Sequence, residues 1–386
     1  MIEYLDYATE RQKEYIHALM KHGSGRKAAA ALGVSKSVLN RAISDVKRKA
    51  AKQGYSPAHD MTRTVPDGYS VKGVSTLYNA DGVISAQWVK STADQARQAE
   101  IQQAAFEAMA AELPKQEPIN APDITLPDLC NVYTITDAHV GALAWRMENL
   151  DPNGDWDLTI AEKTLTGCFE HMINASAAAK TGIVAQIGDF LHFDSLSAVT
   201  PTNGHLLDAD GRFPKVVQAA IRILRRIVNM ALARHDQVVV VMGEGNHDAA
   251  SSVWLREMFK ALYEDEPRLT VIDSVMPYYV YQHGETMLCW HHGHLRKPDQ
   301  LPLLFAAQFP KVWGDTVKRY CHVGHRHHVE IKEHSGMVVE QHSTLAARDA
   351  YASRGGWFSE RQCNAITYHT KFGQVAKNTI TPEMLQ

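Results

Sequence analysis

The sequence predicts an α/β fold in which a layered β-sandwich flanked by helices follows a smaller N-terminal region of helices and a β-hairpin. Two observations carry this prediction. From Asn131 onward, short apolar runs alternate with amphipathic segments of helical length, which is the pattern of layered α/β domains. Late apolar runs follow one another without intervening helices, so we expect the second half to close a β-sandwich.

The length and charge of the chain agree with two domains of unequal size. It has 386 residues, of which 45% are hydrophobic, enough for a large domain with a full core and a smaller one. The net charge of −3 by itself indicates neither a nucleic-acid nor a membrane partner. Residues 21–52 differ, because nine basic residues there face the single acid Asp45, a patch that favours phosphates. The nine are Lys21, Arg26, Lys27, Lys36, Arg41, Lys47, Arg48, Lys49 and Lys52.

The first fifty residues predict helices. Residues 9–21 place apolar side chains at helical spacing, and an alanine-rich helix after Gly25 ends at Leu32-Gly33. Ser35 can cap a further helix, whose expected inner face is Val38, Leu39 and Ile43. Two helices joined by so tight a turn resemble the helix-turn-helix of DNA-binding proteins, whose second helix enters the major groove. The alternative is a helical hairpin that packs on the main domain.

The next segment, residues 54–128, differs in composition from the first fifty residues. Residues 69–78 and 83–89 predict two strands around the turn Asn79–Gly82, a hairpin signal. Residues 91–113, rich in Ala, Gln and Glu, predict a helix, and four prolines from Pro114 to Pro127 predict an extended linker. The predicted domains are therefore residues 1–53, 54–128 and 129–386.

Within residues 129–386, apolar runs bounded by turn residues predict strands, and amphipathic stretches predict helices. The predicted strands are 132–136, 182–187, 237–242, 270–272, 278–281, 287–290, 320–323, 329–333 and 337–342. The predicted helices are 160–179, 214–233, 252–263 and 299–308.

The cysteines and the first residues of the sequence bear on the cellular compartment. The five cysteines are odd in number and widely spaced, so we expect no disulfide framework, no zinc knuckle and a reducing cytoplasmic environment. The start lacks the basic residues and apolar run of a secretory signal. No stretch approaches the ~18 uninterrupted apolar residues of a membrane span, so we expect no membrane partner.

Metal-ligand residue types recur in five blocks, each where a predicted strand ends. Open α/β sheets build their sites at such ends. Carboxylate, imidazole and amide groups suit two divalent metals side by side, a site that activates water against a phosphorus centre. The blocks are Asp137-Ala138-His139, Gly188-Asp189-Phe190-Leu191-His192, Gly245-Asn246-His247-Asp248, His291-His292-Gly293-His294 and Gly324-His325-Arg326-His327.

These blocks, in this order, resemble those of the calcineurin-like metallophosphoesterase superfamily. The resemblance covers the chain from Asn131 to the C-terminus and implies the layered metallophosphoesterase β-sandwich. Within the superfamily the chain most resembles the exonuclease branch that repairs DNA double-strand breaks. Its fusion to a helix-turn-helix is similar to bacteriophage-encoded phosphoesterases.

The resemblance implies a set of ligands. Asp137, His139 and His327 would bind one metal, and Asp189 would bridge to a second. The second would also be bound by Asn246, His292 and His325. A bridging carboxylate holds two such ions about 3.5–4 Å apart, where they generate a bridging hydroxide. We expect manganese, with iron and zinc as alternatives for the same ligand types.

Three further residues are candidates for catalysis. By resemblance, His247 protonates the leaving oxygen or stabilises charge on the phosphate; its alternative role is that of an extra ligand. Asp248 can fix the tautomer of His247, as the acid of a catalytic triad does. His192 matches a position where the repair-nuclease branch has a histidine near the scissile phosphate. Protein Ser/Thr phosphatases continue this block as Asp-Arg-Gly, whereas this chain has no arginine here to clamp a phosphomonoester.

Several residues near the blocks keep two interpretations. His294 is either a ligand or phosphate contact, or a structural residue, while His322 and His328 are expected to pack around the site. Arg326 is either a phosphate contact or a solvated side chain. Trp145 and Trp156 lie in an insertion after the first block, where an aromatic ring can stack on a base or fill the core.

The expected function is hydrolysis of DNA phosphodiester bonds by a two-metal exonuclease or single-strand nuclease, with DNA as the partner. One alternative is a phosphoesterase for small or cyclic nucleotides, because a fold does not determine a substrate. Another is a DNA-binding regulator with a vestigial site. We expect a cytoplasmic location, in a host cell if the chain is phage-encoded. A homo-oligomer remains open.

Overall fold

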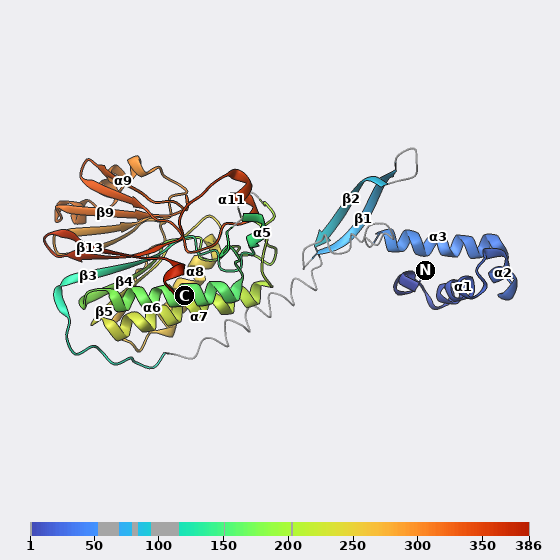
Figure 1. Ribbon diagram of the computed structural model, residues 1–386, viewed down its shortest axis with the longest axis horizontal. Coiled ribbons are helices and arrows are strands. Elements are labelled where there is room, and N and C mark those ends of the chain that lie inside the picture. The colour runs from blue at the N-terminus through green and yellow to red at the C-terminus, as the bar shows by residue number, and fades with distance from the viewer. Residues whose placement is uncertain are drawn as a thin grey trace. The chain divides into compact units, whose positions relative to one another are not determined.

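The computed structural model describes residues 2–52, 69–78, 84–93, 116–149, 151–201 and 204–385. The chain splits into two compact units, residues 1–101 and residues 102–386, which Figure 1 draws with their elements labelled. Each unit has a core of its own.

The first unit begins with the 3-10 helix η1 (Ile2–Tyr7) and three helices, α1 (Glu10–His22), α2 (Gly25–Ala31) and α3 (Lys36–Lys52). Ile16, Ala28 and Leu39 lie in their shared core. Gly33, in the turn between α2 and α3, has a φ of +65°, a conformation that glycine adopts at no steric cost. The Ser35 hydroxyl accepts a hydrogen bond of 3.2 Å from the Val38 N–H, so the predicted cap is confirmed.

The inner face of α3 differs from the prediction at Val38. Leu39 and Ile43 are buried, and Val46 and Ala50 continue the same stripe. Val38 is 47% exposed, because it falls one residue ahead of a stripe that recurs every three or four positions. The prediction that Val38 faces the core is wrong.

The antiparallel strands β1 (Tyr69–Tyr78) and β2 (Ile84–Ala93) confirm the predicted strand pair. Residues 91–93 were expected in a helix, but Ser91 to Ala93 pair with the start of β1, since strand pairing overrides weak helix propensity. The predicted turn at 79–82 and the rest of the predicted helix, residues 94–113, lie outside the described residues.

The second unit contains two β-sheets. The first has six strands in the order β13-β12-β3-β4-β5-β6, in which β3 to β6 are parallel and β12 and β13 antiparallel. They are β3 (Leu126–Ile135), β4 (Ala179–Gln186), β5 (Gln237–Met242), β6 (Leu269–Val271), β12 (Cys363–His369) and β13 (Gly373–Ile380).

The second sheet has five strands in the order β10-β11-β9-β8-β7, with the central β11, β9 and β8 parallel. They are β7 (Tyr279–His283), β8 (Thr286–Trp290), β9 (Lys318–Val323), β10 (Glu330–His334) and β11 (Met337–Gln341).

The two sheets pack face to face between two layers of helices (Figure 1). Side chains alternate along each strand, so Tyr133 of β3 packs on the helical side while Val132 packs against the second sheet. Helices α6 (Leu158–Ala175), α7 (Phe213–Arg234) and α8 (Ala249–Leu262) cover the first sheet. Helices α9 (Leu301–Gln308) and α10 (Pro310–Gly314) cover the second, with η3 (Pro298–Gln300) before them. The mixed α/β sandwich expected from the sequence is confirmed.

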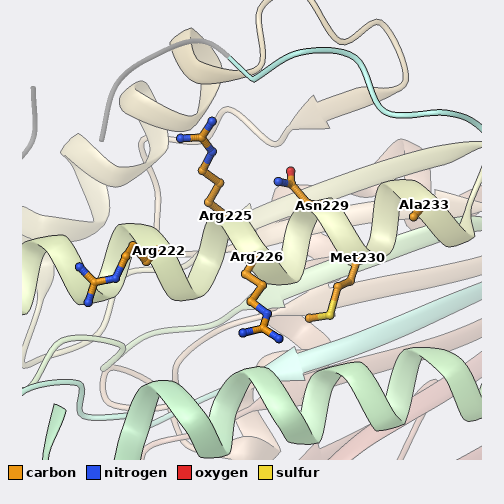
Figure 2. Close-up of a pocket in the computed structure, with 6 residues that line it drawn as sticks. All are labelled: Arg222, Arg225, Arg226, Asn229, Met230 and Ala233. Carbon is orange, nitrogen blue, oxygen red and sulfur yellow. The ribbon is translucent and has the colours of Figure 1, made fainter. Parts of the chain in front are cut away.

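The segment that enters the second unit is anchored to α7 and α8. The Gln116 N–H donates to the Leu262 carbonyl at 2.9 Å. The Gln116 side-chain oxygen accepts from Arg225 at 3.1 Å and from Asn229 at 3.0 Å. Arg225 and Asn229 also line a hollow of about 430 Å³ on α7, which Figure 2 shows. Its lining residues are Arg222, Arg225, Arg226, Asn229, Met230 and Ala233.

Several predicted boundaries shift. Helix α6 ends at Ala175, so the predicted helix over 160–179 extends four residues too far, and the last four run into β4 at Ala179. Strands β12 and β13 were not predicted. All five cysteines are free and buried. Among the described helices, none combines the length and apolar character needed to cross a bilayer.

Candidate metal centre

The five ligand blocks come together at one edge of the sandwich. Asp137, Asp189 and Asn246 follow β3, β4 and β5 of the first sheet, while His292 and the block 324–327 follow β8 and β9 of the second. These strands are parallel within each sheet, so their carboxyl ends meet at a common edge. The predicted position of the blocks at strand ends is confirmed.

The backbone at this edge adopts a sparsely populated conformation. Asp137, His139, Asp189, His325 and His327 have φ values between +43° and +72°, and within the described residues they are the non-glycine residues with positive φ. Each such residue costs on the order of 1–2 kcal/mol. Strain of this kind persists where the surrounding structure enforces it, and it clusters at functional sites.

One group of side chains consists of Asp137, His139 and His327, whose ligand atoms all lie within 4.8 Å of one another. The His327 Nε2 is 3.1 Å from Asp137 Oδ1, and the Nε2 atoms of His139 and His327 are 3.3 Å apart. Nitrogen ligands about 2.0–2.1 Å from one ion stand at about this separation from each other, so the group can hold a cation.

A second group, Asp189, His292 and His325, meets the same 4.8 Å criterion. The His292 Nε2 is 3.2 Å from Asp189 Oδ2 and 3.9 Å from Asp137 Oδ1, so this imidazole joins the two groups. The buried Asn246 Oδ1 has no hydrogen-bond partner within the described residues. A buried amide oxygen without a donor fits a cation ligand.

The buried carboxylates of the two groups favour positive charge on the groups beside them. Burial raises the pKa of the Asp137 carboxyl, but the imidazoles of His327 and His292 more than offset this and hold it well below its usual value. Burial lowers the pKa of His292, yet the carboxylates of Asp189 and Asp137 prevail and raise it to about 9. Two buried carboxylates thus attract protons to their imidazole neighbours, and a divalent cation would take the place of those protons.

His247 and His192 form the flank of the centre nearest His139. The His247 N–H donates to Asp189 Oδ1 at 2.8 Å, and its ring Nδ1 lies 2.8 Å from the His192 carbonyl. Since a carbonyl only accepts hydrogen bonds, this Nδ1 carries a proton, and Nε2 is left for other contacts.

His192 lies buried beside His139. It is 4% exposed, and its Nδ1 is 3.2 Å from the Nδ1 of His139. Burial, followed by the charge of His247, lowers its pKa to about 3, so the ring is neutral. The resemblance implies a place near the scissile phosphate, which stays a prediction; in the structure the ring is buried beside His139.

Asp248 differs from its predicted role. Its carboxylate accepts hydrogen bonds from four backbone N–H groups, those of Asp189, Phe190, Leu191 and Gly245, at 2.7–3.1 Å. It therefore ties the loop after β5 to the loop after β4, and the tautomer of His247 is fixed by the His192 carbonyl instead. The prediction that Asp248 orients His247 is wrong, because buried backbone N–H groups need acceptors and the Asp248 carboxylate supplies them.

Glycines allow the loops to approach the ligands. A Cβ at Gly324 would overlap the Thr136 hydroxyl and lie 2.6 Å from Asp137 Oδ2. A Cβ at Gly245 would overlap both the N–H and the carboxylate of Asp189. Both positions therefore require glycine for contact reasons, whatever their backbone angles.

The structure places the residues that had two interpretations. Trp156 is 1% exposed and packs in the core, whereas Trp145 is 59% exposed. The His294 ring lies 5.3 Å from that of His292, between centroids, so it borders the second group. His322 is buried and pairs with His342 at 2.9 Å. Arg326 is exposed.

Two supporting residues escaped the sequence analysis. The Thr136 hydroxyl donates to Asp137 Oδ2 at 2.5 Å, and the Thr344 hydroxyl donates to the Asp137 carbonyl at 2.5 Å. Thr136 directly precedes the first block, which was a usable signal. Thr344 lies more than two hundred residues from Asp137, so no local pattern points to it.

Comparisons with known proteins were made by sequence and by structure. No family model matches the chain, and no curated protein matches it. The chain is similar to an archaeal phosphodiesterase, with a TM-score of 0.32 and 14% identity over 65% of this chain and 99% of the other. It is similar to a protein of Streptococcus pneumoniae described as a predicted phosphoesterase, with a TM-score of 0.29 and 11% identity over 66% and 91%. A single mutant of Vps29 from Entamoeba histolytica gives a TM-score of 0.29 and 16% identity over 65% and 98%. At these values we base the function on the residues of the site.

Proposed function

We propose that this protein is a metal-dependent phosphoesterase that hydrolyses phosphodiester bonds in DNA. The observation that carries the proposal is the convergence of two buried carboxylates, several imidazoles and an unpartnered amide oxygen at one edge of the sandwich. Five of these residues lie on strained backbone, and strain concentrated on candidate ligands is explained by function better than by packing.

The donor set fits two divalent cations. Asp137, His139 and His327 would hold one of them. Asn246, His292 and His325 would hold the other, with Asp189 between the two. When bound, such a pair polarises phosphate oxygens and generates a nucleophile from water near neutral pH. Mixed oxygen and imidazole donors without thiolate suit manganese, our first choice, and also iron or zinc.

His247 supplies the proton in this scheme. Its Nδ1–H is held by the His192 carbonyl, and its backbone N–H is held by Asp189, so the ring has one orientation. Its Nε2 can then carry a proton to the leaving oxygen of the substrate, the step that limits cleavage of poor leaving groups. His192 positions both His247 and His139.

DNA is the proposed substrate because of the first unit. Helix α3 exposes Lys36, Arg41, Lys47 and Lys49 beside a turn of the kind found in helix-turn-helix proteins. The block after β4 has no arginine to clamp a phosphomonoester, which favours a diester. An exonuclease or single-strand nuclease combines these features.

The test is a nuclease assay with end-labelled single-stranded, duplex and hairpin DNA in the presence of manganese. We expect cleavage that Asp189→Ala and His247→Ala abolish. Intact DNA together with rapid cleavage of a small chromogenic phosphodiester would transfer the assignment to small nucleotides. Less than one ion per chain in metal-replete protein would instead contradict the metal centre itself.

A further inference from the structure

Two loops that leave the metal centre carry a patch of exposed aromatic side chains. The first loop follows His139 and contains α5 (Arg146–Asn149); the second follows β11 and contains α11 (Ala350–Gly355). Five of their large exposed apolar residues, which we call the aromatic rim, are Trp145 (59% exposed), Met147 (63%), Tyr351 (74%), Trp357 (57%) and Phe358 (72%). Leu143 of the first loop is also exposed, at 46%.

The rim is attached directly to the candidate ligands. In the second loop, Thr344 bonds to the carbonyl of Asp137, and the Ser343 hydroxyl donates to the His327 carbonyl at 3.3 Å. The first loop begins at His139 itself. Both loops that carry the rim therefore start at the metal centre.

The two loops are also joined to each other. The Asn149 side chain donates to the Arg348 carbonyl at 3.0 Å, and Arg348 returns a bond of 3.0 Å to the Asn149 carbonyl. Helices α5 and α11 are in contact and lie side by side in Figure 1. Trp156 packs with Ala144 and Ala346 as a small core beneath them. The rim is thus a fixed platform.

The composition of the rim favours nucleobases. The Tyr351 and Trp357 rings meet edge to face at 5.2 Å between centroids, and the Arg348 guanidinium lies 4.0 Å from the Phe358 ring centre. Aromatic rings beside guanidinium groups stack on bases with little regard to sequence. Two nearby acids are engaged, since Asp349 caps α11 and Asp155 pairs with Arg146 at 3.8 Å, while Glu148 of α5 is exposed.

We propose that the aromatic rim binds unstacked bases of single-stranded nucleic acid whose phosphate lies at the metal centre. Only unpaired bases offer their faces to such rings, because a duplex presents its phosphates and groove edges. The inference rests on the proposed function and narrows it to single strands or frayed ends.

The test compares Trp357→Ala and Phe358→Ala with the control Phe372→Ala in the full-length protein. Phe372 is 68% exposed and lies between β12 and β13, outside both loops. Binding of a labelled oligothymidylate is measured by anisotropy with manganese in a His247→Ala background, so that no cleavage occurs, and at raised salt, which weakens phosphate contacts more than stacking. Turnover of a small chromogenic phosphodiester is measured separately with manganese.

We expect the rim variants to bind the single strand about 5- to 100-fold more weakly, with small-diester turnover unchanged and the control like the wild type. Unchanged affinity would overturn the proposal. So would self-association of the wild type that Trp357→Ala abolishes, since the rim would then be a protein interface. Failure to hydrolyse any diester would reject the proposed function alone, because the binding assay needs no catalysis.

Discussion

His192 contacts two neighbours through different atoms. Its ring Nδ1 lies beside the Nδ1 of His139, and its carbonyl accepts a hydrogen bond from the ring Nδ1 of His247. Supporting groups of this type orient a ligand and raise its basicity. The catalytic function of the centre therefore depends on a side chain that is buried and neutral.

Replacing His192 tests this arrangement. His192→Ala leaves His139 Nδ1 without its partner, so we expect metal affinity to fall about 10- to 100-fold, with partial recovery in His192→Asn. Isothermal titration with manganese measures the effect. The matched control is His328→Ala, since the described contacts of His328 are with the Arg326 carbonyl and Glu330 and not with a candidate ligand. Equal affinities for wild type and His192→Ala would show that His192 has no positioning role.

Among elements, the loop after β9 is constrained by Gly324. In Gly324→Ala, the added methyl group would displace Asp137 or Thr136, and neither has free space in the buried centre. We expect metal affinity to fall about 10- to 100-fold, as it does when supporting groups are disturbed. Gly314→Ala is the control, since a Cβ there meets nothing within 4 Å. If both variants bound metal like the wild type, the close packing at Gly324 would be irrelevant to the site.

The elements also show what the sequence could predict. Strands β3, β4 and β5 contain short apolar runs that are soon followed by metal-ligand residues, and these runs with the local chemistry were enough to find them. Strands β12 and β13 contain polar residues such as Asn364 and Lys377 and lack that signal. The role of Asp248 depends on N–H groups nearly sixty residues away, which no local pattern reveals.

At the scale of the whole molecule, buried neutral histidines make the protein sensitive to acid. Burial lowers the pKa of His235 to about 4 and that of His322 to about 3. The unfolded chain binds protons at these sites below about pH 6.5, whereas the folded chain does not. Stability should therefore fall as the pH falls from about 6.5 toward these values, by on the order of 1.4 kcal/mol per pH unit for each such histidine.

Urea unfolding at about pH 7 and about pH 5 measures this loss. In His235→Gln the free energy of unfolding should decrease less between these two pH values, since one site no longer takes up a proton on unfolding. A free energy of unfolding that is the same at both values would contradict the assignment.

The division into two units predicts separable binding and catalysis. Deleting residues 1–113 removes the basic residues of the first unit and keeps Gln116, which anchors the segment to α7. We expect weaker DNA binding with a shallower dependence on salt, because fewer counterions are released. Turnover of a small phosphodiester should be unchanged. Unaltered DNA affinity and salt slope in the truncated protein would indicate that the first unit docks a protein partner.

The pairing of β12 with β3 has a consequence for synthesis. Strand β3 pairs on one side with β4, but its other neighbour, β12, follows it in the chain only after more than two hundred residues. Until then, β3 presents an open edge with apolar side chains such as Val132, and open edges invite aggregation. The metal centre begins directly after β3, so the strand that leads to Asp137 is paired on both sides only once β12 has been made. A chaperone that covers this edge would govern the yield of active protein.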